Sequence, residues 1–242
     1  MTKKTIIAFA IAAAIFTQTL SGCSTGVSTA QIPVRKPLEE QSQVASGFLT
    51  YMSDKYGKDF DPIPMDGTDI ITRPDMLLVR EHGVDGDRNC ATVLKDSSGI
   101  YSDNLYGVTI RSEYETAITE LVSTQFSKAK VYIIGYAENS FSEDLTTDTR
   151  LEDAIQMGQC PTANIYAFVE LPDGTAAQFS TAVSSVGKQI GTAAIPCTMT
   201  VFWLAHGKLA DIDCSNFETY LPDYHAADGD ACLAIKSIAI SV

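Results

Sequence analysis

The sequence predicts an α+β domain in which helices pack on one face of a mixed or antiparallel sheet, with an α/β layered fold as the alternative. Two observations carry this prediction. Short apolar or β-branched runs recur along the chain, and segments with helical spacing lie between them. No linker-like stretch interrupts residues 38–242, so we expect them to form a single globular domain.

Four segments are predicted to be helices. In the first, apolar residues recur at helical spacing over residues 45–56, after Pro37 and before a stop at Gly57. The second is expected to begin at Ser112, because Ser112 and Glu115 have the spacing of a capping box and apolar residues at helical spacing follow them.

The same capping-box spacing occurs twice more. Thr149 with Glu152 predicts a short helix that ends near Gly158, and Thr175 with Gln178 predicts the start of a fourth helix. Six apolar or β-branched runs are predicted to be strands, over residues 76–80, 91–95, 131–135, 164–171, 198–204 and 233–240.

The charge balance excludes one class of partner. The chain has 30 Asp and Glu against 17 Lys and Arg, and its formal net charge is −13. The resulting field repels phosphates, and the sequence has no basic stripe, so we expect no nucleic acid partner. Beyond the N-terminal apolar run, no segment offers the roughly 18 uninterrupted apolar residues of a membrane helix, which excludes a polytopic membrane protein.

The N-terminus is typical of an export signal. Lys3 and Lys4 precede an apolar run over residues 6–16, which is too short to span a bilayer but has the proportions of a signal peptide. The segment Leu20-Ser21-Gly22-Cys23 follows at the expected distance. It resembles the lipobox of bacterial lipoproteins, which consists of an aliphatic residue, two small residues and a cysteine.

The resemblance implies cleavage between Gly22 and Cys23 and attachment of a diacylglycerol to the Cys23 sulfur. Residues 1–22 would then be a signal peptide, and residues 23–37 a lipidated cysteine with a flexible tether rich in Ser, Thr, Gly and Pro. Two or three acyl chains would hold the protein durably at the cell membrane or outer envelope, facing outside the cytoplasm. The alternatives are an uncleaved membrane helix and a plain secretory signal with an incidental cysteine.

A second resemblance concerns the first predicted helix. The tyrosine, lysine, glycine and acidic pattern of residues 48–60 resembles the first helix in a class of small, uncharacterised lipoproteins of Gram-positive bacteria. This resemblance implies an exported α+β domain. It supplies no catalytic residues, because none are assigned in that class.

The cysteines allow a disulfide. The chain has six cysteines, and Cys23 is assigned to the lipid, which leaves an odd number for pairing. We expect a bridge between Cys214 and Cys232, because the segment between them has the composition of a loop with several acids. The alternative is that all the remaining cysteines are free thiols.

Two acidic segments have oxygen ligands in a pattern that suits a metal ion. Residues 85–96 mimic a calcium-binding loop, but Cys90 stands where that loop requires a glycine, so a polar hairpin turn is expected instead. The second segment can offer carboxylates and an imidazole to a divalent cation, although we favour a solvated loop. Its members are Asp223, His225, Asp228 and Asp230. No cofactor is expected.

No motif for nucleophilic catalysis or phosphate binding is present. The possible bases are His82, His206 and His225, and His206 is expected in a turn because it precedes Gly207. Trp203 is expected in the core, with ligand stacking as the alternative.

These observations favour a non-enzymatic, lipid-anchored envelope protein that binds a protein, a polymer or a small molecule. One alternative is an extracytoplasmic hydrolase that uses acidic residues, and another is a metal-binding lipoprotein.

The lipobox makes a direct prediction about Cys23. A Cys23→Ala variant lacks the only sulfur that the motif offers for lipid attachment, so metabolic labelling with palmitate should be lost. Labelling that persists in this variant would show that the lipid assignment is wrong.

Overall fold

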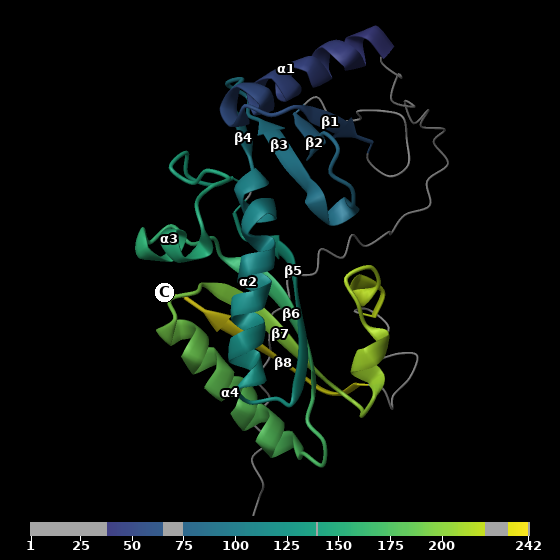
Figure 1. Ribbon diagram of the computed structural model, residues 1–242, viewed down its shortest axis with the longest axis vertical. Coiled ribbons are helices and arrows are strands. Elements are labelled where there is room, and N and C mark those ends of the chain that lie inside the picture. The colour runs from purple at the N-terminus through teal and green to yellow at the C-terminus, as the bar shows by residue number, and fades with distance from the viewer. Residues whose placement is uncertain (1–37, 65–74, 139, 221–231, 242) are drawn as a thin grey trace, which may run out of the picture. The chain divides into compact units, whose positions relative to one another are not determined.

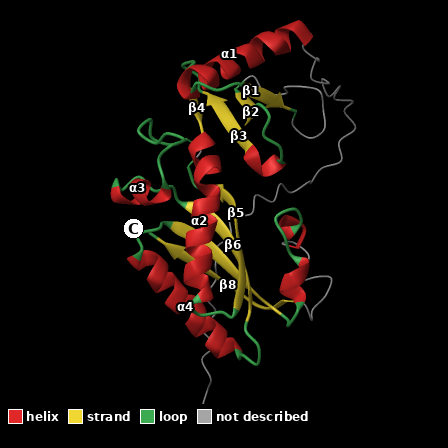
Figure 2. Ribbon diagram, in the orientation of Figure 1, coloured by secondary structure: helices red, strands yellow, loops and turns green. Residues whose placement is uncertain are grey.

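The protein is described here by a computed structural model, and the described residues form four α-helices and two four-stranded sheets (Figures 1 and 2). The structure describes residues 38–64, 75–138, 140–220 and 232–241, all within the compact unit Pro37–Val242. One sheet is antiparallel and the other is mixed. The predicted α+β class is therefore confirmed.

The first sheet is a simple antiparallel meander. Its strands follow chain order: β1 (Phe60–Ile63), β2 (Met76–Glu81), β3 (Cys90–Lys95) and β4 (Tyr101–Asp103). Helix α1 (Leu38–Tyr56) packs on this sheet, and its Phe48 and Met52 are fully buried with Val79 and Val93. The segment after β2 connects it to antiparallel β3, so the hairpin predicted for residues 85–96 is confirmed.

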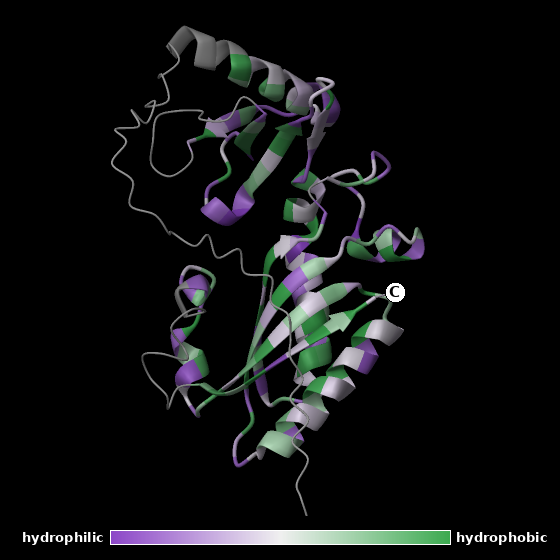
Figure 3. Ribbon diagram, turned by 180° about the vertical axis from the view of Figure 1, so that it is seen from behind, coloured by the Kyte–Doolittle hydropathy of each residue, from purple (hydrophilic) through white to green (hydrophobic). Residues whose placement is uncertain are grey.

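The second sheet has the order β5-β6-β7-β8. Its strands are β5 (Lys128–Tyr136), β6 (Ala163–Glu170), β7 (Cys197–Leu204) and β8 (Cys232–Ile240). The central pair, β6 and β7, is parallel, and the two outer pairs are antiparallel. In Figure 3 hydrophobic residues run along these strands.

Each face of the second sheet is covered. Helices α2 (Leu105–Ser123) and α4 (Ala176–Thr192) pack on one face, where Ile118, Val183 and Met199 are buried (Figure 1). Two 3-10 turns, η2 (Lys208–Asp211) and η3 (Phe217–Tyr220), contribute Leu209 and Phe217 to a smaller apolar cluster with Phe168 and Phe202. The sheet is therefore packed on both sides.

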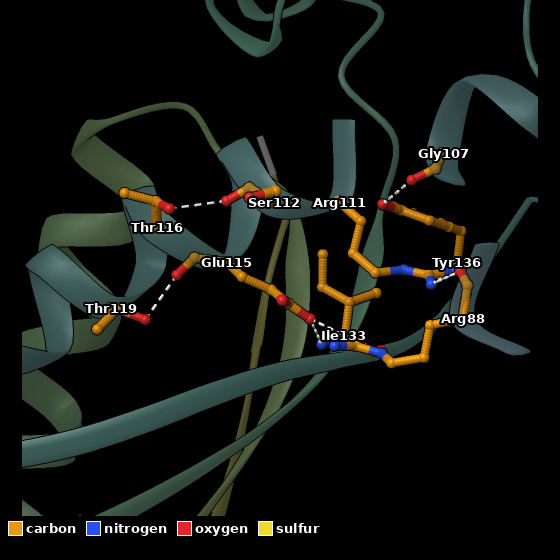
Figure 4. Close-up of polar contacts among 9 residues, drawn as sticks. All are labelled: Arg88, Gly107, Arg111, Ser112, Glu115, Thr116, Thr119, Ile133 and Tyr136. Atoms are coloured by element: carbon orange, nitrogen blue, oxygen red, sulfur yellow. Dashed lines mark hydrogen bonds and ion pairs between the residues drawn. The ribbon is translucent and has the colours of Figure 1, made fainter. Parts of the chain in front are cut away.

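The predicted starts of the second and third helices are wrong, the second by several residues and the third by one. Helix α2 begins at Leu105 rather than Ser112, and the Leu105 N–H donates a hydrogen bond of 2.9 Å to the Asp103 carboxylate. The Glu115 side chain does not cap a helix start, because it accepts hydrogen bonds from Arg88 and from the Ile133 N–H (Figure 4).

The third and fourth helices show how the capping pattern succeeds or fails. Helix α3 (Leu151–Gln156) starts one residue later than predicted, with Asp153 accepting from the Arg150 N–H. Helix α4 starts as predicted, since Thr175 and Gln178 form the reciprocal capping box.

An arginine connects the β2–β3 hairpin to the second sheet (Figure 4). Arg88 donates to Glu115 and, at 3.3 Å, to the Ile133 carbonyl of β5, and its guanidinium lies 5.5 Å from the Phe217 ring. Arg111 donates to the Arg88 carbonyl. Because both polar backbone groups of Ile133 are bonded to these side chains, this part of the β5 edge is closed to further pairing.

A buried carboxylate connects α1 to the start of α2. The Asp103 side chain accepts from Tyr51 at 2.8 Å, Lys55 at 2.8 Å and Tyr56 at 2.7 Å, in addition to the Leu105 N–H. Burial alone raises the pKa of this carboxyl, but the four hydrogen bonds outweigh burial, and the pKa lies below its ordinary value. The charge is therefore fully compensated inside the protein.

Removal of Asp103 should destabilise the fold strongly. In an Asp103→Ala variant Lys55 and two tyrosines lose their acceptor, and we expect a loss of about 3 kcal/mol of unfolding free energy at neutral pH, measured by urea denaturation. The pKa of Asp103 is lower in the folded protein than in the unfolded chain, where it is about 4, so the ionised carboxylate stabilises the fold at pH values above the unfolded pKa. This stabilisation is lost as the pH falls through the folded pKa. The difference from wild type should therefore shrink in acid.

The control is Glu120→Gln, which removes an exposed carboxylate from α2 and should change stability by less than about 0.5 kcal/mol. A difference between wild type and Asp103→Ala that stays constant from neutral to acid pH would contradict the assigned role of the carboxylate.

Candidate functional site

A cavity lies where the parallel strands β6 and β7 end. It encloses roughly 260 Å³ and is lined by residues 170–174, 203–206 and 233. These residues are the last of β6 with the loop that follows it, the last of β7 with its turn, and one residue of β8. Ligands commonly bind at the carboxyl ends of parallel strands, because the loops that leave the sheet there converge.

The loop from β6 to α4 has a specific backbone shape. Asp173 adopts a left-handed conformation with φ of 54°, and a side chain at Gly174 would place its Cβ 2.5 Å from the Leu171 side chain. Only glycine fits at that position without a shift of its neighbour. Together with the Thr175 capping box, this shape sets where the cavity wall lies.

Glu170, the last residue of β6, carries a buried carboxylate next to the cavity. Its side chain is 2% exposed, and Oε1 accepts the backbone N–H of Gly207 at 2.9 Å and of Leu209 at 3.2 Å. Gly207 has φ of 84°, a left-handed conformation that brings both N–H groups to the same oxygen. One carboxylate oxygen is therefore held by the turn after β7.

The other oxygen of Glu170 is different. Among the residues that the structure describes, none donates a hydrogen bond to the buried Oε2. Two basic side chains approach Oε2, with Lys128 Nζ at 3.6 Å and His206 Nδ1 at 3.7 Å, both beyond a good hydrogen-bond length. The Lys128 and His206 side chains are 62% and 80% exposed, so little packing holds them in place.

The remaining walls are largely apolar. Trp203 is buried and stacks on Phe179, with ring centroids 5.5 Å apart and an interplanar angle of 24°. Leu171 and Leu204 also line the cavity, and so does Leu233, a large apolar side chain that is 52% exposed. The walls of the cavity are therefore mainly apolar, and Asp173 and His206 add polar side chains at the loop ends.

Two residues singled out in the sequence meet in this cavity. His206 occupies the predicted turn and Trp203 is buried as predicted, yet both line the site. Glu170 was missed, because a single acid at the end of an apolar strand gives no pattern and its partners lie more than thirty residues away. His82 lies elsewhere, paired at 2.9 Å with Asp61 on the surface.

Several predicted positions lie outside the described residues. They are the lipidation site with its cleavage position, Gly22 and Cys23, and the acidic loop that contains Asp223, His225, Asp228 and Asp230. Within the described ranges, no group of three or more His, Cys, Asp or Glu side chains is placed to hold a metal ion.

The five cysteines in the described ranges are free thiols. Cys214 is exposed and Cys232 is half-buried, so the bridge predicted between them is not formed in this structure. Burial raises the pKa of both the Cys160 and the Cys197 thiol to about 12. These two thiols are expected to be poor nucleophiles at neutral pH.

Comparison with protein families, curated proteins and solved structures finds no match for the chain.

In the part of the chain that the structure describes, no helix has the length and apolar character needed to cross a membrane.

The cavity has the chemistry of a binding site. None of the ten residues that line it is a serine, threonine or cysteine, so these walls offer no hydroxyl or thiol for covalent catalysis. What the site offers is a mainly apolar surface that includes Trp203. The Glu170 carboxylate lies on the face of the sheet that the η2 turn covers, whereas Trp203 packs against Phe179 of α4 on the other face.

The thiol environments predict an order of chemical reactivity. With iodoacetamide at mildly alkaline pH, exposed Cys214 should be alkylated first, and Cys160 and Cys197 should react only after denaturation. Peptide mass spectrometry of samples taken over time gives the order. Rapid labelling of Cys197 in the folded protein would contradict its buried position.

Proposed function

We propose that the protein is a lipid-anchored binding protein of the cell envelope whose globular domain holds a small ligand in the cavity at the ends of β6 and β7. The observation that carries this proposal is the cavity itself, which lies where the parallel strands β6 and β7 end and has mainly apolar walls that include Trp203. The lipobox at residues 20–23 and the tether after it support the anchored location.

The energetic argument comes from burial. The walls of the cavity are mainly apolar, so a ligand with a compact apolar body gains binding free energy when it leaves water for this surface.

A binding role is favoured over hydrolysis. A hydrolase would need an activated nucleophile or two carboxyl groups placed across a scissile bond. The acids that line the cavity are Glu170 and Asp173, and Asp173 is exposed in the loop after β6. The backbone N–H groups at this site already bind Glu170, which leaves them unable to stabilise an oxyanion.

Trp203 allows a direct test, because it is the only tryptophan of the chain and it lines the cavity. The probes are 2-phenylethylamine, 2-phenylethanol and 3-phenylpropanoate, which share a compact apolar body and differ in the polar end. We expect at least one to change the tryptophan emission saturably, with a Kd of roughly millimolar or lower for a ligand of this size.

An Ala205→Phe variant provides the comparison, since a larger side chain on the cavity wall should abolish the response while circular dichroism shows an intact fold. If none of the three probes gives a saturable response in wild type, the proposed function is wrong.

A further inference from the structure

We infer that the outer edge of β8 is an interaction surface, along which a second copy of this chain pairs its own β8 in antiparallel orientation. The inference goes beyond the proposed function and does not depend on a ligand in the cavity. Strand β8 is the last strand of the second sheet, with β7 as its neighbour on one side (Figure 1). Among the residues that the structure describes, no strand pairs with its other side.

Three of the four sheet edges in the described ranges have features that block pairing with another chain. Strand β1 has four residues, one of which, Pro62, has no N–H to donate, and β4 has only three residues. Strand β5 is interrupted by a bulge between Ile133 and Gly135. The polar backbone groups of Ile133 are already bonded to Arg88 and Glu115 (Figure 4). These three edges are therefore poor templates for a further strand.

Strand β8 lacks these features. It has nine residues, contains no proline, and keeps a regular register with β7 from Ala234 to Ile240. Its one charged residue is Lys236, whose ammonium group donates to the Ser180 carbonyl at 2.8 Å and to the Ser184 hydroxyl at 2.9 Å. Both serines belong to α4. The charge is therefore bound to the chain's own helix, and a long, regular and mostly apolar edge remains.

The charge of the surroundings favours a second copy as the partner. Residues 174–210 and 232–242 contain no Asp or Glu, although the chain has 30 of them. These ranges include α4, β7 and β8, so this edge lacks the negative charge that repels two copies elsewhere. Two identical strand edges in antiparallel orientation are also self-complementary about a two-fold axis.

The side chains of β8 predict the register. About a two-fold axis perpendicular to the sheet, one residue faces its own counterpart in the other copy. An axis at Lys236 would bring two ammonium groups opposite each other, which is unfavourable. An axis at the exposed Ser237 avoids this repulsion and pairs the regular part of the strand, residues 234–240, with itself.

The experiment measures the mass of the purified full chain by sedimentation velocity over a range of concentrations. Wild type should form a dimer with a dissociation constant of roughly micromolar, as expected for an interface at the small end of the known range. Ser237→Lys places like charges opposite each other and should weaken the dimer about fivefold, while circular dichroism shows an intact fold. A wild-type chain that stays monomeric far above micromolar concentration would contradict the inference.

A mixture of variants identifies the partner. Ser237→Glu alone should weaken the dimer as Ser237→Lys does. An equimolar mixture of the two variants should associate at least as tightly as wild type, because opposite charges then face each other. A mixture that associates no better than either variant alone would contradict the pairing of β8 with β8.

The matched control is Thr198→Lys, which adds the same charge at an exposed position on the neighbouring strand β7 and should leave the dimer unchanged. An equal loss in this variant would show that the face of the sheet, and not its edge, holds the two copies together. Dimers of equal strength in every variant would place the contact on another surface, since all the variants share the same N-terminus. Either outcome would overturn the inference.

Discussion

The parallel pairing of β6 with β7 is the constraint on which the second sheet depends. Their register runs without interruption from Ala163 opposite Cys197 to Glu170 opposite Leu204. Two parallel neighbours need a crossover, and α4 provides it while covering one face of the sheet. Both strands therefore end at the same edge, where the loop to α4 and the turn at Gly207 meet around one cavity. The position of the site follows from the topology.

Two buried carboxylates of this domain differ in how they are hydrogen-bonded. Asp103 and Glu170 are the buried polar or charged residues in the described part of the chain. Asp103 accepts four hydrogen bonds and connects α1 to α2, so its charge is compensated from within. Glu170 accepts two, both on Oε1. Both oxygens of Asp103 are therefore bonded, whereas Glu170 uses one oxygen to hold the turn after β7.

The sequence was sufficient for features that depend on local pattern. All six predicted strands exist, and the Thr175 capping box starts α4 as expected. Local pattern failed where distant residues compete for a side chain, as when Arg88 and the Ile133 N–H bind Glu115 inside α2. Strands β1 and β4 were not predicted, because they have only four and three residues and show no alternation. The sequence pattern of each strand does not indicate how the strands pair into two sheets. It also does not indicate that Glu170, Trp203 and His206 lie around the same cavity.

Glu170 is a carboxylate in otherwise apolar surroundings. Its neighbours on the strand, Phe168 and Val169, are fully buried, and its register partner is the buried Leu204. An apolar residue in that setting would bury more surface and leave no charge to compensate. The fold nevertheless directs two backbone N–H groups of one turn to Oε1, so the Glu170 carboxylate connects the turn after β7 to the end of β6. This connection lies on the face of the sheet that carries Phe168 and Leu204, whereas Trp203 packs on the α4 face and lines the cavity.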